Sequence, residues 1–192
     1  MGPDDVPYDE CTPEQMVALA RQHHLPTIAY TYTEPLTWIE YMTDIARLAH
    51  GAGLYNVLVS AGYVNEQPLR DLAPLLDAAN VDLKSFSDET YRQYNRASLE
   101  PVLRTLTILR EAGVHLEVTL LLIPGINTDD AGLHRMFRWL VDHDMADCAL
   151  HISRFFPMYK MQEAPTTPLA DMRRAEAIAY DEGIAHVFLG NV

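Results

Sequence analysis

Two charged side chains stand one strand repeat apart in the segment Asn80-Val81-Asp82-Leu83-Lys84. If this segment is a β-strand, Asp82 and Lys84 lie on the same face, roughly 7 Å apart along the strand. On an inward face such a pair could hold a zwitterion or a carboxylate, with Lys84 as a point charge. A structural ion pair inside a barrel is the alternative, because buried charges are retained when they are paired.

A second polar cluster follows the apolar run 27–30, where Thr31-Tyr32-Thr33-Glu34-Pro35 precedes an amphipathic segment. Thr33 and Glu34 therefore come at the carboxyl end of an expected strand, which is the end where α/β folds bind ligands. Glu34 could accept an ammonium group. An acid before a proline at the first helical position would equally stabilise a helix without any ligand.

Three later strand ends carry polar or small residues. The turn that begins at Ser60 is small enough for its backbone to approach a ligand. The turn Pro124-Gly125-Ile126-Asn127 exposes backbone groups that could read a flat heterocycle, and Asn127 or Thr128 could instead cap the next helix. His151 could face a substrate or be a satisfied interior histidine. Ser153 shares its face but has no G-x-S-x-G elbow, which disfavours a hydrolase.

The composition excludes several function classes. The 192 residues carry a net charge of -13, which argues against binding to a nucleic-acid backbone. No apolar run approaches the roughly 20 residues of a membrane span, so no membrane association is expected. Cys11 and Cys148 are the two cysteines and form no CxxC pair, which predicts a reducing, cytoplasmic setting. A four-cysteine zinc or iron–sulfur site cannot be built from this chain alone.

Alternating apolar strands and helical patterns predict an α/β fold with a mainly parallel sheet. The expected strands are 27–32, 55–60, 80–84, 115–122, 148–152 and 185–189, and the expected helices are 13–24, 36–51, 66–78, 98–112, 129–144 and 168–182. In 115–122, Glu117 and Thr119 share one face and aliphatic residues the other. An open doubly wound sheet is apolar on both faces, so this alternation favours a partial barrel. Residues 1–12 are interpreted as an extension and 13–192 as the core domain.

The order of the motifs resembles a known family. These motifs are Tyr30-Thr-Tyr-Thr-Glu-Pro35, Ser60-Ala-Gly-Tyr63, Asn80-Val-Asp-Leu-Lys84, Ile123-Pro-Gly-Ile-Asn127, His151-Ile-Ser-Arg-Phe-Phe-Pro157 and Leu189-Gly-Asn-Val192. Together they resemble the radical SAM enzymes related to pyruvate formate-lyase activating enzyme, and most closely the AmmeMemoRadiSam-system branch. The resemblance implies a (β/α)6 partial barrel. It also implies reductive cleavage of S-adenosylmethionine (SAM) by a [4Fe–4S] cluster, which yields a 5′-deoxyadenosyl radical for hydrogen abstraction.

The resemblance implies a role for each strand end. Thr33 and Glu34 would contact the methionine amino group of SAM, and Ser60 would lie on the same rim of the barrel. Asp82 and Lys84 would contact the methionine carboxylate. Glu117 and Thr119 would contact the ribose. Pro124, Gly125 and Asn127 would lie near the adenine, and His151 near the substrate. Such residues orient a cofactor that supplies the chemistry itself.

The sequence departs from the family in its cysteines. The CxxxCxxC cluster motif is absent, and Cys11 falls beyond the place of the cluster loop. We therefore expect a barrel truncated at both ends, without its first strand and cluster loop and without metal ligands. A cluster-less module that binds SAM or a partner is the alternative, and a lyase that uses Lys84 as a Schiff base is a third reading. The exposed edge of strand 27–32 predicts a homodimer, or cover by residues 1–11.

Overall fold

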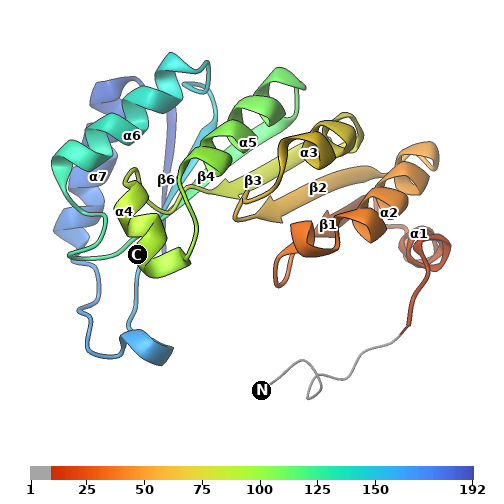
Figure 1. The fold of residues 1–192 in the computed structure, drawn as a ribbon, viewed down its shortest axis with the longest axis horizontal. Coiled ribbons are helices and arrows are strands. Elements are labelled where there is room, and N and C mark those ends of the chain that lie inside the picture. Colours follow the sequence, from red (N-terminus) through yellow and green to blue (C-terminus); the bar gives the residue numbers. More distant parts are fainter. Residues whose placement is uncertain (1–9) are drawn as a thin grey trace.

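The computed structural model describes residues 10–192, which form six parallel strands in one open sheet (Figure 1). The strands follow the chain in the order β1-β2-β3-β4-β5-β6. Their bounds are β1 Thr27–Tyr30, β2 Tyr55–Ser60, β3 Ala78–Asp82, β4 His115–Leu122, β5 Ala149–Arg154 and β6 His186–Gly190. Sequential parallel order means that every crossover is of the same βα type, as in one part of a barrel.

Seven α-helices and several short turns flank the strands in this part of the chain, and α1 precedes the first strand. The helices are α1 Pro13–Gln22, α2 Ile39–Gly51, α3 Glu66–Leu72, α4 Asp88–Thr90, α5 Glu100–Glu111, α6 Asp130–Asp142 and α7 Leu169–Glu182. Short 3-10 turns cover Pro35–Trp38, Ala73–Leu75 and Tyr159–Met161, and a π-helical turn covers Tyr91–Asn95. Figure 1 shows α2, α3, α5 and α6 in a row along one side of the sheet. None of the helices within 10–192 is long and apolar enough to cross a membrane.

Strand alternation separates an apolar face from a polar face, as the sequence predicted. In β4 the aliphatic residues Leu116, Val118 and Leu120 are buried in the core, while Glu117 and Thr119 are half-buried on the opposite face. The buried face packs against the helices and forms one continuous core. The other face is the concave inner side of the partial barrel, and it carries the polar residues of β3, β4 and β5.

The boundaries of several elements differ from the sequence expectation. The third helix ends at Leu72, because the 3-10 turn that contains Pro74 follows it, and β3 then begins at Ala78. Lys84 consequently lies just beyond the end of β3. The expected cap of the sixth helix by Asn127 or Thr128 is wrong: Asp129 is the N-cap and accepts a hydrogen bond from the Gly132 amide at 2.7 Å.

The first strand forms one edge of the sheet. Within the described residues β1 pairs with β2, from Thr27 opposite Tyr55 to Tyr30 opposite Leu58, and no strand lies on its other side. The predicted homodimer through this edge stays a prediction. The predicted cover by residues 1–11 falls mostly on positions outside the described part of the chain.

Candidate functional site

A polar network crosses the inner face of β3, β4 and β5. Oε2 of Glu117 lies 2.9 Å from Nε2 of His151 and accepts a hydrogen bond from Nδ2 of Asn80 at 3.3 Å. The Thr119 hydroxyl donates to Oδ1 of Asn80 at 2.8 Å. The strand register explains these contacts, because His151 lies opposite Thr119 and therefore beside Glu117 along the strands. The network brings a carboxylate, an imidazole, an amide and a hydroxyl onto one half-buried surface.

Asp82 and Lys84 form the ion pair that the alternation predicted. Lys84 Nζ lies 2.7 Å from Asp82 Oδ2, and the side chains are 38% and 39% exposed. A pair this exposed contributes on the order of 1 kcal/mol or less to folding, because water screens it. The Lys84 amide donates to the hydroxyl of Tyr91 at 3.1 Å, and burial raises the pKa of Tyr91 to about 12. Tyr91 thereby fixes the backbone that presents the lysine.

Glu34 joins the carboxyl ends of β1 and β2. Its Oε1 accepts hydrogen bonds from the Ser60 hydroxyl at 2.7 Å and the Leu36 amide at 3.2 Å, and its Oε2 accepts from the Ala61 amide at 2.8 Å. Glu34 is therefore the cap of the short 3-10 turn, the structural alternative that the sequence left open. A carboxylate has about four acceptor positions, so roughly one remains for a ligand.

The turn after Ser60 has a packing reason for its glycine. Gly62 has a φ of +68°, and a Cβ added there would lie 2.8 Å from Cγ1 of Val81. Glycine is therefore required by a positive φ and by close approach to β3. The sequence predicted that this small turn admits a ligand, but its glycine also serves to let the end of β2 pack closely against β3.

Asn127 holds the ends of β3 and β4 together. Its Nδ2 donates to the carbonyls of Lys84 and Leu121, both at 2.8 Å, and its Oδ1 accepts from the Ile123 amide at 2.7 Å. The residue is 6% exposed. Pro124 and Gly125 form the more accessible outer side of the same turn. If this turn contacts a ligand, the exposed backbone rather than the Asn127 side chain is the part that reaches it.

A cavity of about 270 Å³ opens at the mouth of the barrel beside this turn, and we call it the mouth pocket. Its lining includes Lys84, Leu121 and Ile126, together with Tyr94 and Met161. The sequence analysis missed Tyr94 and Met161. Tyr94 and Met161 stand in the segments 85–97 and 153–167, where the sequence predicts neither helix nor strand. The Ser87-Asp88-Glu89 start of the α4 segment is the signal that could have revealed a helix near Tyr94. The pocket is more apolar than the network on the inner face.

The predicted site residues fall into two groups. Thr33, Glu34 and Ser60 lie at the ends of β1 and β2, and the other group lies at β3 to β5. The second group consists of Asp82, Lys84, Glu117, Thr119, Pro124, Gly125, Asn127 and His151. No hydrogen bond or ion pair between described side chains joins the two groups directly. The first group, the Asp82–Lys84 pair and the turn 124–127 lie at the carboxyl-end rim of the sheet, whereas Glu117, Thr119 and His151 lie further back within β4 and β5.

The described residues contain no cluster of three or more His, Cys, Asp or Glu side chains that could hold a metal ion. Cys148 begins the segment leading into β5 and is 7% exposed. Burial raises the pKa of its thiol to about 11, which disfavours the thiolate that metals require. The residues present therefore do not fit a [4Fe–4S] cluster, which needs several cysteine thiolates.

A family model described as the Radical SAM superfamily matches residues 3–137. The chain belongs to the radical SAM superfamily. An uncharacterised protein of Methanocaldococcus jannaschii is 38% identical over 190 residues, which is 99% of this chain and 56% of that protein. The trans-4-hydroxy-L-proline dehydratase activating enzyme of Clostridioides difficile is 21% identical over 95 residues, 50% of this chain and 32% of the enzyme. This radical SAM chain thus spans about half the length, or less, of these curated relatives.

Solved structures confirm the fold of the radical SAM domain. A domain of pyruvate-formate lyase-activating enzyme from Bacteroides vulgatus superposes with a TM-score of 0.70 at 16% identity, over 85% of this chain and 98% of that one. SuiB of Streptococcus suis, bound to SAM, superposes with a TM-score of 0.75 at 8% identity, over 97% of this chain and 45% of SuiB. The predicted partial barrel and the resemblance to activating enzymes are confirmed.

Proposed function

We propose that the inner face of this radical SAM domain binds SAM at the carboxyl ends of its strands. The observation that carries the proposal is Lys84, which pairs with Asp82 and lines the mouth pocket, on the same face of the sheet as the Glu117–His151 contact. A methionine moiety offers an ammonium and a carboxylate, a ribose offers hydroxyl groups, and an adenine offers a flat apolar ring. The inner face offers matching carboxylates, a lysine, and an apolar pocket.

Different residues would contact different parts of SAM. Asp82 and Lys84 would meet the charged groups of the methionine, with Glu34 and Ser60 at the same rim and Thr33 beside them. Glu117 and Thr119 would accept hydrogen bonds from the ribose hydroxyls, because the hydroxyl of Thr119 already donates to Asn80. The backbone at Pro124 and Gly125 would lie against the adenine with Asn127 holding the turn, and His151 would lie toward the substrate. SAM supplies a 5′-deoxyadenosyl radical when it is cleaved reductively.

In this proposal, SAM is cleaved reductively only when another segment that carries the cluster cysteines joins this domain. The chain holds two cysteines, and a CxxxCxxC motif needs three. A second candidate function follows from the same count: a module that binds SAM or a partner without catalysis. Fusing a CxxxCxxC segment ahead of the domain separates the two, since formation of 5′-deoxyadenosine with a reductant supports the first function alone.

Titration calorimetry with SAM tests the binding proposal. Lys84→Ala and Glu117→Gln should each weaken binding about tenfold or more, the factor expected when one charged contact is removed. Lys160→Ala is the matched control, because Lys160 is the other lysine of the chain and lies in the exposed segment after β5. It should leave the affinity unchanged. Absence of any heat of binding at millimolar SAM would overturn the proposal.

A further inference from the structure

A second polar cavity lies behind the barrel mouth, between the start of α6 and the segment that follows β3. Its volume is about 180 Å³, and we call it the outer cavity. Its walls include the hydroxyl residues Ser85, Ser87 and Thr90, and the charged residues Asp129 and Arg135. It shares the wall residues Thr90, Ile126 and Asn127 with the mouth pocket, so the Asn127 turn separates the two spaces.

Ser85 presents to the outer cavity a hydroxyl that no described residue bonds. The residue is 3% exposed, and its hydroxyl makes no hydrogen bond to any described residue. Every fully buried side-chain nitrogen or oxygen in 10–192 has a partner, so the Ser85 hydroxyl must retain some accessible surface. Because Ser85 lines the outer cavity, that surface opens into it. The Ser85 hydroxyl is therefore free to donate a hydrogen bond to a group inside the outer cavity.

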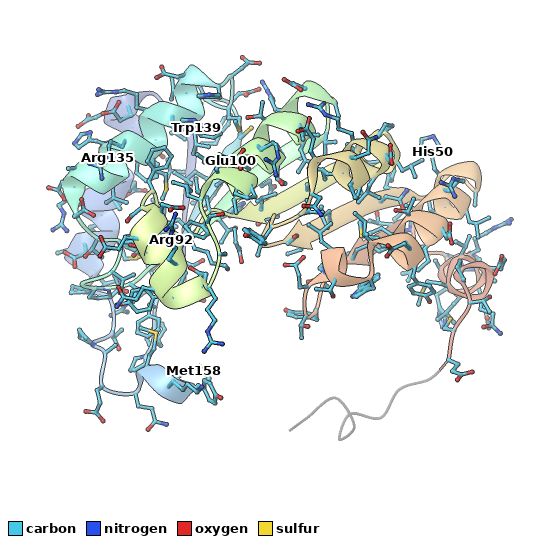
Figure 2. All side chains as sticks on the ribbon, in the orientation of Figure 1. His50, Arg92, Glu100, Arg135, Trp139 and Met158 are labelled. Carbon is cyan, nitrogen blue, oxygen red and sulfur yellow. The ribbon has the colours of Figure 1, made fainter. Side chains whose placement is uncertain are left out.

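Arg135 supplies a positive charge that no described carboxylate neutralises. The other arginines nearby are paired: Arg138 binds Glu182 at 2.8 Å, and Arg174 binds Asp130 at 2.8 Å. Arg135 forms no such pair within 10–192, and Figure 2 shows its position on α6. Asp129 supplies one negative charge, with Oδ1 occupied by the Gly132 amide. Asp129 and Arg135 are not ion-paired with each other, so both charges are available to a third group.

We propose that the outer cavity binds a small carboxylate that carries a hydroxyl or amino group beside its carboxyl carbon. Arg135 would bind the carboxylate, with the hydroxyls of Ser85 and Thr90 as further donors. The second oxygen of Asp129 would accept a hydrogen bond from the hydroxyl or ammonium group of the ligand. The carboxylate of Asp129 disfavours a dianion such as hydrogen phosphate, because it repels the second negative charge. This site does not depend on SAM binding at the inner face.

Tryptophan fluorescence can report occupancy of the outer cavity. Phe86 lines the cavity, and its ring centroid lies 6.3 Å from that of Trp139, which Figure 2 labels on α6. The chain has two tryptophans, so a Trp38→Phe background leaves Trp139 as the single reporter. Glycolate, glycine, acetate and inorganic phosphate are the probes. A dissociation constant on the order of 1 mM is expected for glycolate or glycine.

The variants decide between a built site and general ionic effects. Arg135→Gln and Ser85→Ala should each weaken glycolate or glycine binding, Arg135→Gln by about tenfold. Arg173→Ala, an exposed arginine on α7, should leave binding unchanged. Glycolate and glycine distinguish the hydroxyl from the amino ligand, and tighter binding of either one than of acetate supports the proposal. Equal binding of acetate, tighter binding of phosphate, or no response to any probe would overturn it. SAM affinity measured in the same variants should not change.

Discussion

Asn127 is the residue on which the geometry of the mouth depends most directly. Its amide contacts three backbone groups on two strand ends, at 2.7 to 2.8 Å, and all of these groups are partly or fully buried. Buried polar groups that lose their partners retain the cost of having left water. Asn127 therefore fixes the backbone of Lys84 by donating a hydrogen bond to the Lys84 carbonyl.

Asn127→Ala should lower the free energy of unfolding by about 2–3 kcal/mol, because it leaves one amide and two carbonyls without this partner. Urea unfolding followed by circular dichroism measures the change. Asn65→Ala is the control, since Asn65 is exposed and makes no side-chain capping bond at the start of α3. It should cost no more than about 0.5 kcal/mol. Equal losses in the two variants would show that Asn127 is not a clamp.

The two cysteines should differ in reactivity. Burial raises the pKa of Cys148 to about 11, so at pH 8 its reactive thiolate is nearly absent, while Cys11 is half-buried near the start of α1. Iodoacetamide at pH 8 should label Cys11 first, and mass spectrometry of the peptides measures the ratio. The labelling rate of Cys148 should rise as the pH approaches 11. In guanidinium chloride both cysteines should be labelled at similar rates. Similar labelling rates of Cys11 and Cys148 in the folded protein would contradict the raised pKa of Cys148.

At this scale the sequence predicted contacts within a strand better than contacts between strands. Asp82 and Lys84 share a face because alternation is a local property, and they do form an ion pair. The contact of Glu117 with His151 depends on the register of β4 with β5, which alternation within either strand does not determine. The carboxylate of Glu34 was placed at the correct rim, but its hydrogen bond with Ser60 depends on tertiary packing.

Among the elements, the strands were predicted more accurately than the segment after β3. The six strands follow from apolar runs between helices, and all six are present within two residues of their expected starts. The α4 segment was missed, although Ser87 caps it by accepting a hydrogen bond from the Thr90 amide. Its three-residue helix and π-helical turn are too short for an apolar periodicity to develop.

The segment between β5 and α7 is closed at its base by one threonine. Thr167 is fully buried; its hydroxyl donates to the Leu122 carbonyl and accepts from the Phe155 amide at 3.2 Å, and its amide donates to the Phe155 carbonyl. Phe155 and Thr167 are hydrogen-bonded to each other at the two ends of the segment 156–166, and so hold its ends together. Exposed apolar residues, Phe156, Met158 and Tyr159, lie along it, and Figure 2 labels Met158 near its tip.

Thr167→Val should release this segment, because valine keeps the shape of threonine and removes both hydroxyl bonds. We expect a loss of about 1–3 kcal/mol in the free energy of unfolding and faster cleavage between Phe156 and Thr166 by a broad-specificity protease. Limited proteolysis with mass spectrometry locates the cuts. Thr166→Val, one residue earlier and with no hydrogen bond to the base, should behave as the unchanged protein. Unaltered cleavage in Thr167→Val would show that the base is held by other contacts.

For the whole molecule, the free side of β1 is the feature with the most direct consequence for assembly. A strand edge presents unpaired backbone groups that can pair with a second chain. We expect a concentration-dependent dimer in sedimentation velocity, which Ala29→Pro weakens because proline removes an amide donor from the edge. Proline at Ala78 or at Ala149 is not a suitable control, because β3 and β5 lie inside the sheet. The exposed change Glu89→Ala is the control and should leave the dimer intact. A monomer at all concentrations would exclude assembly through this edge.

The whole chain combines the proposed SAM-binding face with a cysteine content too low for the cluster of its superfamily. Two cysteines cannot provide the three thiolates of a CxxxCxxC site, and Cys148 is buried at the opposite end of its strand from the polar rim. Anaerobic reconstitution with iron and sulfide should therefore leave this protein without the broad visible absorbance of a [4Fe–4S] cluster. Glu34, Asp82 and Lys84 should still allow SAM to bind in calorimetry on the same sample. A stable brown protein would mean that ligands other than a cysteine triad, or a second copy of the chain, complete the site.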